Sequence, residues 1–421
     1  MIRSALAACM LLAAAMPGAA QTSAEVSAQE RARFSHGELR PGADGNDPQA
    51  PNRANFDPAK VGTLAPPPLF LSSADGTRAG WSARADAIRT MVEDEFVGRI
   101  PAQAADLRIV WTSQREGSGD NLVGQLIGPA GRMGPVIDGV LSLPPGTAKV
   151  PVVIEYSYIW PPGFRLPGPP APTLREVALA HGWGHFAYRP TLLQADDLAR
   201  LSEGVIGLAK YPREEHDWGA LRAWGWGASR LREHLSANPR IDSTRISLAG
   251  HSRFGKAVLV AAAFDHGFAD ALVSSSGAGG AKLMRRDFGE RMENMADPYA
   301  SIWYAPRIRH YAGRAGIADW PVDAHMLIAL RAPRPLLVAT GLASEGDGWT
   351  DPDGQWIATT LAQPAWEVLG RPVPRTGLPH PLSLEQAHFP LGWYQHDMGH
   401  VMYPAFGAFF DHADRFASSA Q

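Results

Sequence analysis

From residue 150 to the C-terminus, short apolar runs alternate with longer segments whose apolar residues have helical spacing. The run Val150–Tyr156 is almost continuously apolar, which is typical of a parallel strand that helices cover on both faces. Alternation of this kind over about 270 residues predicts a mostly parallel central sheet with helices on both faces. The sequence therefore predicts an α/β fold.

The individual elements follow from local patterns. Apolar and β-branched runs predict strands over Leu107–Trp111, Leu122–Ile127, Val136–Leu143, Val150–Tyr156, Phe186–Tyr188, Arg245–Ala249, Ala271–Ser274 and Leu336–Thr340. Helical spacing predicts helices over Trp81–Val97, Trp218–Leu235, Lys256–Phe264, His325–Leu330 and Phe406–Phe416. The Pro-rich stretches around Pro161–Pro172 and Pro372–Pro390 are predicted to be rim loops, where binding residues usually lie.

The first twenty residues predict a secretory signal peptide. Arg3 supplies the positive charge, Ala5–Met16 is apolar but too short to span a bilayer, and Gly18–Ala20 offers small residues for cleavage. Leu6–Cys9 resembles a lipoprotein cleavage box, but only eight residues precede Cys9, too few for an apolar region. Cleavage after Ala20 would remove the only cysteine. We therefore expect an exported protein, periplasmic or extracellular, without disulfides.

The rest of the chain divides by composition. Residues 21–68 are polar, rich in Pro, Asn, Gly and Ala, and end in three prolines, which predicts an extended arm or linker. Residues 69–421 are predicted to form a single domain. Lys and Arg number 39 against 42 acidic residues, a net charge of -3, so nothing in the charge favours nucleic acid. We expect a monomer with no nucleic-acid partner and no membrane partner after signal cleavage.

The stretch Arg245–Lys256 carries the strongest chemical signal. A strand-like run leads into Gly250-His251-Ser252-Arg253-Phe254-Gly255 and then into an apolar helix. This is the context of a nucleophile elbow, a tight turn that raises a serine Oγ above the sheet. The second glycine follows Ser252 by three residues, whereas the G-x-S-x-G pattern has it after two. The alternative is a plain strand-to-helix turn in which the serine caps the helix.

A serine nucleophile needs a base and usually an acid. In folds with a nucleophile elbow, the acid follows a late strand and the histidine stands before the last helix. The loop after Leu336–Thr340 contains Glu345, Asp347 and Asp351, and His400 precedes the closing helix. These residues are therefore the candidates for acid and base.

Two metal-like patterns are weak. His388, His396 and His400 lie close together in the sequence, but Gly399 would interrupt a helix and no H-E-x-x-H is present. Asp351-Pro-Asp-Gly354 matches part of a calcium loop and lacks the remaining ligands, which favours a turn. We expect no metal.

Several motifs together carry a family resemblance. They are Trp218-Gly-Ala-Leu, Trp224-Gly-Trp226, Gly250–Lys256, Ser276–Gly280, Arg285–Glu290, Ala332–Pro335 and Gly348–Pro352. In these motifs the chain resembles the glucuronoyl esterases, carbohydrate esterase family fifteen, from about Trp218 to the C-terminus, with weaker similarity upstream. The resemblance implies an α/β-hydrolase fold, no cofactor, Ser252 as nucleophile and His400 as general base. It also assigns to Arg253 the support of the oxyanion.

The same resemblance implies a sugar site and shows one departure. Lys256 and Glu290 resemble the residues that hold the uronate hydroxyls, and Trp349 resembles the aromatic that packs on the sugar. No equivalent of the family's sugar-binding glutamine is evident in Met292–Trp303.

Many members place the catalytic acid where this chain has Ser275, whereas others place it two residues before the tryptophan. Asp347 stands at that second place, so we expect Asp347 as the acid, with Glu345 as the second choice.

The resemblance implies an exported serine esterase that hydrolyses 4-O-methyl-glucuronoyl esters, such as those joining xylan side groups to lignin alcohols. The substrate partner is then a glucuronic acid ester. One alternative is another carbohydrate carboxylesterase, such as an acetyl xylan esterase. The other is a carbohydrate-binding homologue that lost catalysis when position 275 became serine.

Overall fold

The structure is a computed structural model that describes residues 55–117, 119–160, 171–296, 299–312, 316–374 and 387–416. The predicted signal peptide, residues 21–54 of the arm and most of both Pro-rich loops lie outside these residues. Its strands are β1 (Arg108–Glu116), β2 (Gly119–Ile127), β3 (Met133–Ser142), β4 (Val150–Tyr156), β5 (Gly184–Tyr188), β6 (Ile241–His251), β7 (Ala271–Ser274), β8 (Leu336–Thr340) and β9 (Leu391–Gln395).

The described helices lie mainly in the second half of the chain. The α-helices are α2 (Arg78–Val92), α3 (Leu174–Ala180), α4 (Pro190–Leu193), α5 (Val205–Ala209), α6 (Ala220–Ser236), α7 (Arg253–Phe264), α8 (Met292–Ala296), α9 (Ile308–Ala312), α10 (Ala324–Ala329), α11 (Pro352–Ala362), α12 (Pro364–Glu367) and α13 (Phe406–Phe416). Among the residues described, none of these helices combines the length and apolarity needed to cross a bilayer.

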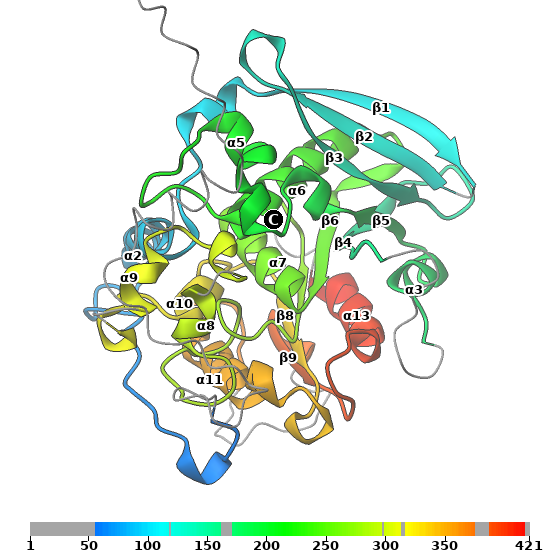
Figure 1. The fold of residues 1–421 in the computed structure, drawn as a ribbon. Helices are drawn as coiled ribbons and strands as arrows, with labels where there is room; N and C mark the ends of the chain where they lie inside the picture. Colours follow the sequence, from blue (N-terminus) through cyan, green and yellow to red (C-terminus); the bar gives the residue numbers. More distant parts are fainter. Residues whose placement is uncertain are drawn as a thin grey trace, which may run out of the picture.

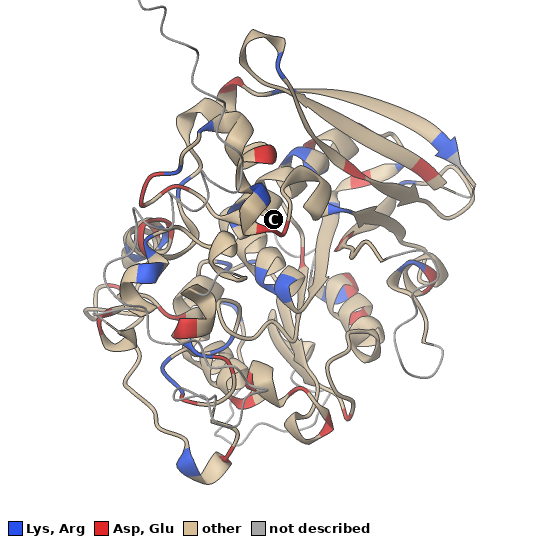
Figure 2. Cartoon of the chain, in the orientation of Figure 1, with Lys and Arg blue, Asp and Glu red and all other residues tan. Residues whose placement is uncertain are grey.

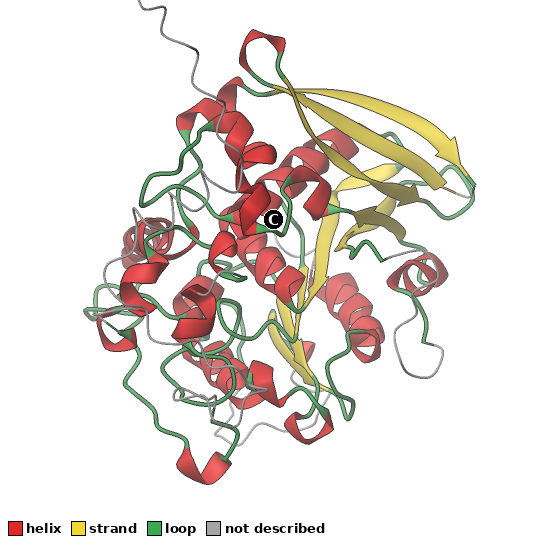
Figure 3. Cartoon of the chain, in the orientation of Figure 1, coloured by secondary structure: helices red, strands yellow, loops and turns green. Residues whose placement is uncertain are grey.

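The strands of the described residues form one sheet in the order β1-β2-β3-β5-β4-β6-β7-β8-β9. The pairs from β5–β4 through β8–β9 are parallel, and β1, β2, β3 and β5 pair in antiparallel fashion. Figure 1 shows the antiparallel strands β1 and β2 reaching beyond the helices, while Figure 3 shows the parallel part running between them. The predicted mostly parallel α/β sheet is confirmed.

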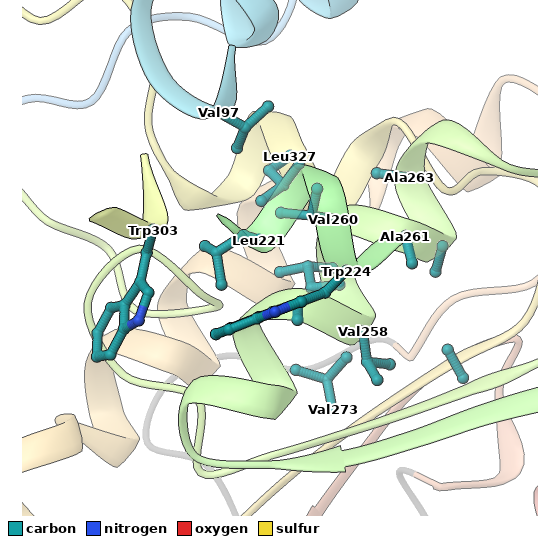
Figure 4. Packing of buried hydrophobic residues seen from close by; sticks show 14 of the residues in the cluster. Val97, Leu221, Trp224, Val258, Val260, Ala261, Ala263, Val273, Trp303 and Leu327 are labelled. Atoms are coloured by element: carbon teal, nitrogen blue, oxygen red, sulfur yellow. The ribbon is translucent and has the colours of Figure 1, made fainter. Parts of the chain in front are cut away.

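Alternate residues of the central strands enter different cores, because successive side chains of a strand point to opposite faces. Val152 and Ile154 of β4 join the larger apolar cluster with α6 and α7, and Val153 joins the second cluster with α3 and α13. Figure 4 shows Trp224 of α6 within the larger cluster. The two faces are thus both covered, which explains the continuous apolar runs.

One strand was not predicted. The last strand predicted from the sequence is Leu336–Thr340, but Leu391–Gln395 also forms a strand, β9, which pairs with β8 in parallel. This run directly follows Pro390 and contains a glycine, two features that weaken a strand signal. A Cβ at Gly392 would be a tight fit, because it would lie 3.0 Å from Leu337 Cδ1 and 3.1 Å from His412 Nε2.

Residues 55–64 lie along the segment Arg285–Gly289. The amide of Leu64 donates to the Arg285 carbonyl at 3.0 Å, and that of Asp287 donates to the Gly62 carbonyl at 2.8 Å. The amide of Gly289 donates to the Asn55 carbonyl at 2.9 Å. The last part of the predicted arm is therefore bonded to the domain. Figure 2 shows basic and acidic residues interspersed over the described part of the molecule.

A buried histidine–aspartate contact ties the closing helix to the sheet. His412 Nδ1 of α13 lies 2.6 Å from Asp270 Oδ2, directly before β7, and both side chains are fully buried. His412 Nε2 lies 2.9 Å from the Phe389 carbonyl oxygen. Burial lowers the pKa of nearby Arg331 to about 9, and Asp270 opposes that shift. Asp270 therefore balances buried positive charge at the end of β7 opposite the elbow.

We expect Asp270→Ala to lower the free energy of unfolding by about 3–5 kcal/mol, because it leaves buried groups without their counter-charge. Urea denaturation of the variant and the parent measures this loss. Glu233→Ala removes a half-exposed partner of Arg230 and should cost no more than about 1 kcal/mol. Equal stabilities of the two variants would contradict the prediction.

Candidate active site

Ser252 occupies a strained turn between β6 and α7. It has φ 58° and ψ −128°, a conformation that a residue with a Cβ adopts at a cost of about 1–3 kcal/mol and that is common at functional sites. Its amide donates to the Ser274 carbonyl at 2.9 Å, which ties the turn to β7. Its side chain makes no capping bond to the described α7, so the helix-cap alternative fails.

Gly250 and Gly255, the two glycines around the serine, are needed for different steric reasons. A Cβ at Gly250 would lie 2.4 Å from the Phe254 carbonyl oxygen, inside the turn itself. A Cβ at Gly255 would lie 2.8 Å from the Ser274 carbonyl oxygen, on the neighbouring strand. The second glycine is therefore needed where α7 passes over β7, which accounts for its place three residues after Ser252.

Buried Asp347 is paired with the partly exposed His400. Asp347 Oδ1 lies 2.8 Å from His400 Nδ1, and the carboxylate is fully shielded from solvent. Burial raises the pKa of Asp347, but the bonds to His400 and Ser275 outweigh it and leave the pKa lowered. The group is thus a carboxylate at neutral pH. Glu345, the second choice, is exposed and bonds to Ser344.

Ser275 hydrogen-bonds to Asp347. It stands at the position where, by the resemblance described above, many family members have their catalytic acid. Its Oγ donates to Asp347 Oδ2 at 2.7 Å. The Gly341 amide donates to the same oxygen at 2.8 Å, and Thr350 Oγ1 donates to Oδ1 at 3.0 Å. The carboxylate is therefore held from several sides, and sequence reasoning gave Ser275 no role of this kind.

The surroundings of His400 are aromatic. The Trp349 ring centroid lies 4.7 Å from that of His400, and the His251 centroid lies 4.3 Å away. Burial lowers the pKa of His251 to about 3, with His400 contributing in the same direction. Burial also lowers the pKa of His396. His400 therefore lies beside one neutral imidazole, that of His251, and beside Trp349, which is predicted to pack on a sugar.

Lys256 and Glu290, both expected at the sugar site, lie close together. Lys256 is buried, donates to the Ser276 carbonyl at 2.6 Å and lies 3.5 Å from Glu290 Oε2. Glu290 Oε2 also accepts from the Ala278 amide at 2.8 Å. Burial lowers the pKa of Lys256 while Glu290 opposes the shift. A solvated lysine on the first turn of a helix is therefore not what the structure contains.

Arg253 contacts Asp196 and Tyr158, two residues that were not among the predicted site residues. Its Nη1 lies 2.5 Å from Asp196 Oδ2, and its guanidinium carbon lies 5.9 Å from the Tyr158 ring centroid. The Tyr158 hydroxyl donates to the His251 carbonyl at 3.0 Å. Burial raises the pKa of Tyr158 to about 12, so this hydroxyl stays protonated. Tyr158 is the second residue after β4. Ligand sites gather at that end of parallel strands, so this position is a usable sequence signal.

Acidic and histidine residues elsewhere do not form a metal centre in the part of the chain that is described, where no group of three or more such ligands converges. Asp351 instead pairs with Arg286, and Lys282 Nζ lies 3.9 Å from its second oxygen. Asp351 stands immediately before α11. The Asp351–Gly354 stretch is thus the start of a helix held by cations.

Comparison with known proteins finds similarity to esterases in each case. The family model described as "Glucuronyl esterase, fungi" matches residues 137–370. A CE15 glucuronoyl esterase from Teredinibacter turnerae superimposes with a TM-score of 0.82 at 35% identity, over 92% of this chain and 99% of that chain.

Two curated relatives match over shorter stretches. The carbohydrate esterase MZ0003 from an unknown prokaryotic organism is 38% identical over 157 residues, 37% of this chain and 35% of that protein. The 4-O-methyl-glucuronoyl methylesterase of Hypocrea jecorina is 30% identical over 237 residues, 53% of this chain and 46% of that protein. The chain therefore spans less than half the length of either relative.

Proposed function

Because the chain belongs to the glucuronyl esterase family, we propose that it hydrolyses esters of 4-O-methyl-glucuronic acid through Ser252, His400 and Asp347. The observation that carries the proposal is the 2.8 Å contact between buried Asp347 and His400, whose ring lies 4.3 Å from that of His251, the residue before the strained Ser252 turn. A nucleophile, a base and an acid that orients the base are the parts that acyl transfer by serine requires.

The proposed reaction has two halves. Ser252 Oγ attacks the ester carbonyl while His400 Nε2 takes its proton, and the tetrahedral oxyanion is stabilised by backbone amides of the turn and by Arg253. His400 then protonates the leaving alcohol, which leaves a glucuronoyl ester on Ser252. Water activated by His400 releases the uronic acid and restores the serine. Asp347 holds His400 Nδ1 throughout and stabilises the imidazolium.

The sugar is proposed to lie near Lys256, Glu290 and Trp349. The lysine and glutamate offer a donor and an acceptor for hydroxyl groups, and Glu290 keeps part of its side chain exposed. We propose esters between xylan side groups and lignin alcohols as the natural substrates, and no cofactor takes part. Export after cleavage of the predicted signal is part of the same proposal. The monomeric state and the lack of nucleic-acid and membrane partners stay predictions.

Hydrolysis of benzyl glucuronate by the mature protein tests the substrate class. We expect turnover of this ester and much weaker turnover of simple acetyl esters, because only the uronate offers hydroxyls to Lys256 and Glu290. Alcohol release followed by chromatography measures both reactions side by side. Preferred cleavage of acetyl esters would move the function to another carboxylesterase, and inactivity on both esters would favour the carbohydrate-binding alternative.

A further inference from the structure

Asp196 is a partly buried carboxylate that pairs with Arg253, the residue after the nucleophile, and the proposed mechanism leaves it without a role. It lies on the loop after α4, and its side chain is 13% exposed. One oxygen accepts from Arg253 Nη1 at 2.5 Å, and the other accepts from Trp303 Nε1 at 2.6 Å. Each oxygen thus meets a different element, so the carboxylate is fixed in position and in orientation.

Arg253 sits among aromatic rings in addition to this bond. Its guanidinium carbon lies 5.2 Å from the Tyr299 centroid, 5.6 Å from that of Trp303 and 5.9 Å from that of Tyr158. These contacts attract a cation but do not select one rotation of the planar group. A hydrogen bond to a fixed carboxylate does select one, because the five N–H groups of arginine have a rigid arrangement.

The charges point the same way. Burial lowers the pKa of Arg253, but Asp196, with smaller contributions from Tyr299 and Tyr158, more than offsets this, so the net pKa is raised. Lys256 is a second cation nearby and is buried; its Nζ lies 5.8 Å from the Trp303 centroid, and Arg253 helps to lower its pKa. Arg253 and Lys256 both lie beside the Trp303 indole, so their positive charges repel each other. Asp196 offsets this repulsion at Arg253, and Glu290 does the same at Lys256.

We infer that Asp196 is a positioning residue for the esterase reaction, which holds the Arg253 guanidinium in the orientation that stabilises the oxyanion. Asp196 takes one N–H of the guanidinium and leaves others for the developing charge on the ester oxygen. Stabilisation of this kind depends on donors that are in place before the charge forms. The inference rests on the proposed function, since it needs acyl transfer at Ser252.

The test is a double-mutant cycle between Asp196→Asn and Arg253→Gln. Asparagine keeps the size of the side chain and removes its charge, so Asp196→Asn should lower kcat by about tenfold to a hundredfold, while KM changes less than about twofold. In the Arg253→Gln background the same change should alter kcat by less than about threefold, because the group that Asp196 positions is gone. Equal losses in both backgrounds, or a kcat within about twofold of the parent for Asp196→Asn, would overturn the inference.

Two controls separate this inference from its premise. Asp265→Asn removes a similarly buried carboxylate that pairs with Arg232 at 3.2 Å, at the far end of α7 from Ser252, and kcat should stay unchanged. Labelling of Ser252 by a serine-directed phosphonate reports the nucleophile independently of the substrate. An unlabelled parent would contradict the proposed function itself. A labelled parent that cleaves only acetyl esters allows the same cycle to be run with those esters.

Discussion

Ser252→Ala is expected to lower kcat on a glucuronoyl ester by about four to six orders of magnitude, as for other serine enzymes that lose their nucleophile. The substitution removes the only atom proposed to form the acyl-enzyme. The oxyanion donors and the sugar site remain, so KM should change little. Alanine lacks the hydroxyl but keeps the Cβ that the turn already accommodates at φ 58°, so the fold should be retained.

Steady-state hydrolysis of benzyl glucuronate measures this effect, with circular dichroism as the check on folding. Ser247→Ala is a matched control, because Ser247 is a buried serine of the same strand β6 and has no part in the proposed chemistry. The control should retain its activity. Turnover near the parent level in Ser252→Ala would refute the assignment of the nucleophile.

Asp347→Asn is expected to lower kcat by about 10⁴, the cost seen when the acid of a serine triad becomes an amide. An asparagine can present its amide group to His400 Nδ1 and so favour the wrong tautomer of the imidazole. Its neutral side chain also fails to stabilise the imidazolium.

Ser275→Ala tests the same carboxylate from the other side. It removes one bond to a charged group, worth about 1.5–3 kcal/mol, so kcat should fall by about ten- to a hundredfold. Glu345→Gln should leave kcat unchanged, because Glu345 is exposed and bonds to Ser344. A larger loss for Ser275→Ala or Glu345→Gln than for Asp347→Asn would show that the acid has been misplaced.

Elements with continuous apolar runs were predictable. Ala271–Ser274 and Leu336–Thr340 have the same bounds in the sequence analysis and in the structure, because strands buried on both faces carry an unbroken apolar signal. The predicted family and α/β-hydrolase fold are confirmed by the family match and by the Teredinibacter turnerae structure. β9 was missed because Pro390 and Gly392 flank and interrupt a run of only five residues.

The site was predictable only where chemistry has a local pattern. The turn at Ser252 has a motif, and Asp347 and His400 have expected places after a late strand and before a last helix. Asp196 has neither, since its partners Arg253 and Trp303 lie 57 and 107 residues away in sequence. Asp197, its neighbour, caps a short helix through the Ala199 amide, so the dipeptide alone does not tell the two carboxylates apart.

Shortening the chain to residues 69–421 would remove the partner of the segment Arg285–Gly289, including the Asn55 carbonyl that accepts from Gly289. Glu290 is the next residue, so a recombinant form trimmed at that point would keep the central sheet but loosen one side of the proposed sugar site. The smallest unit suitable for expression and kinetic work therefore begins at or before Asn55. We expect a start at residue 69, where the composition changes, to raise KM for the proposed uronate substrate.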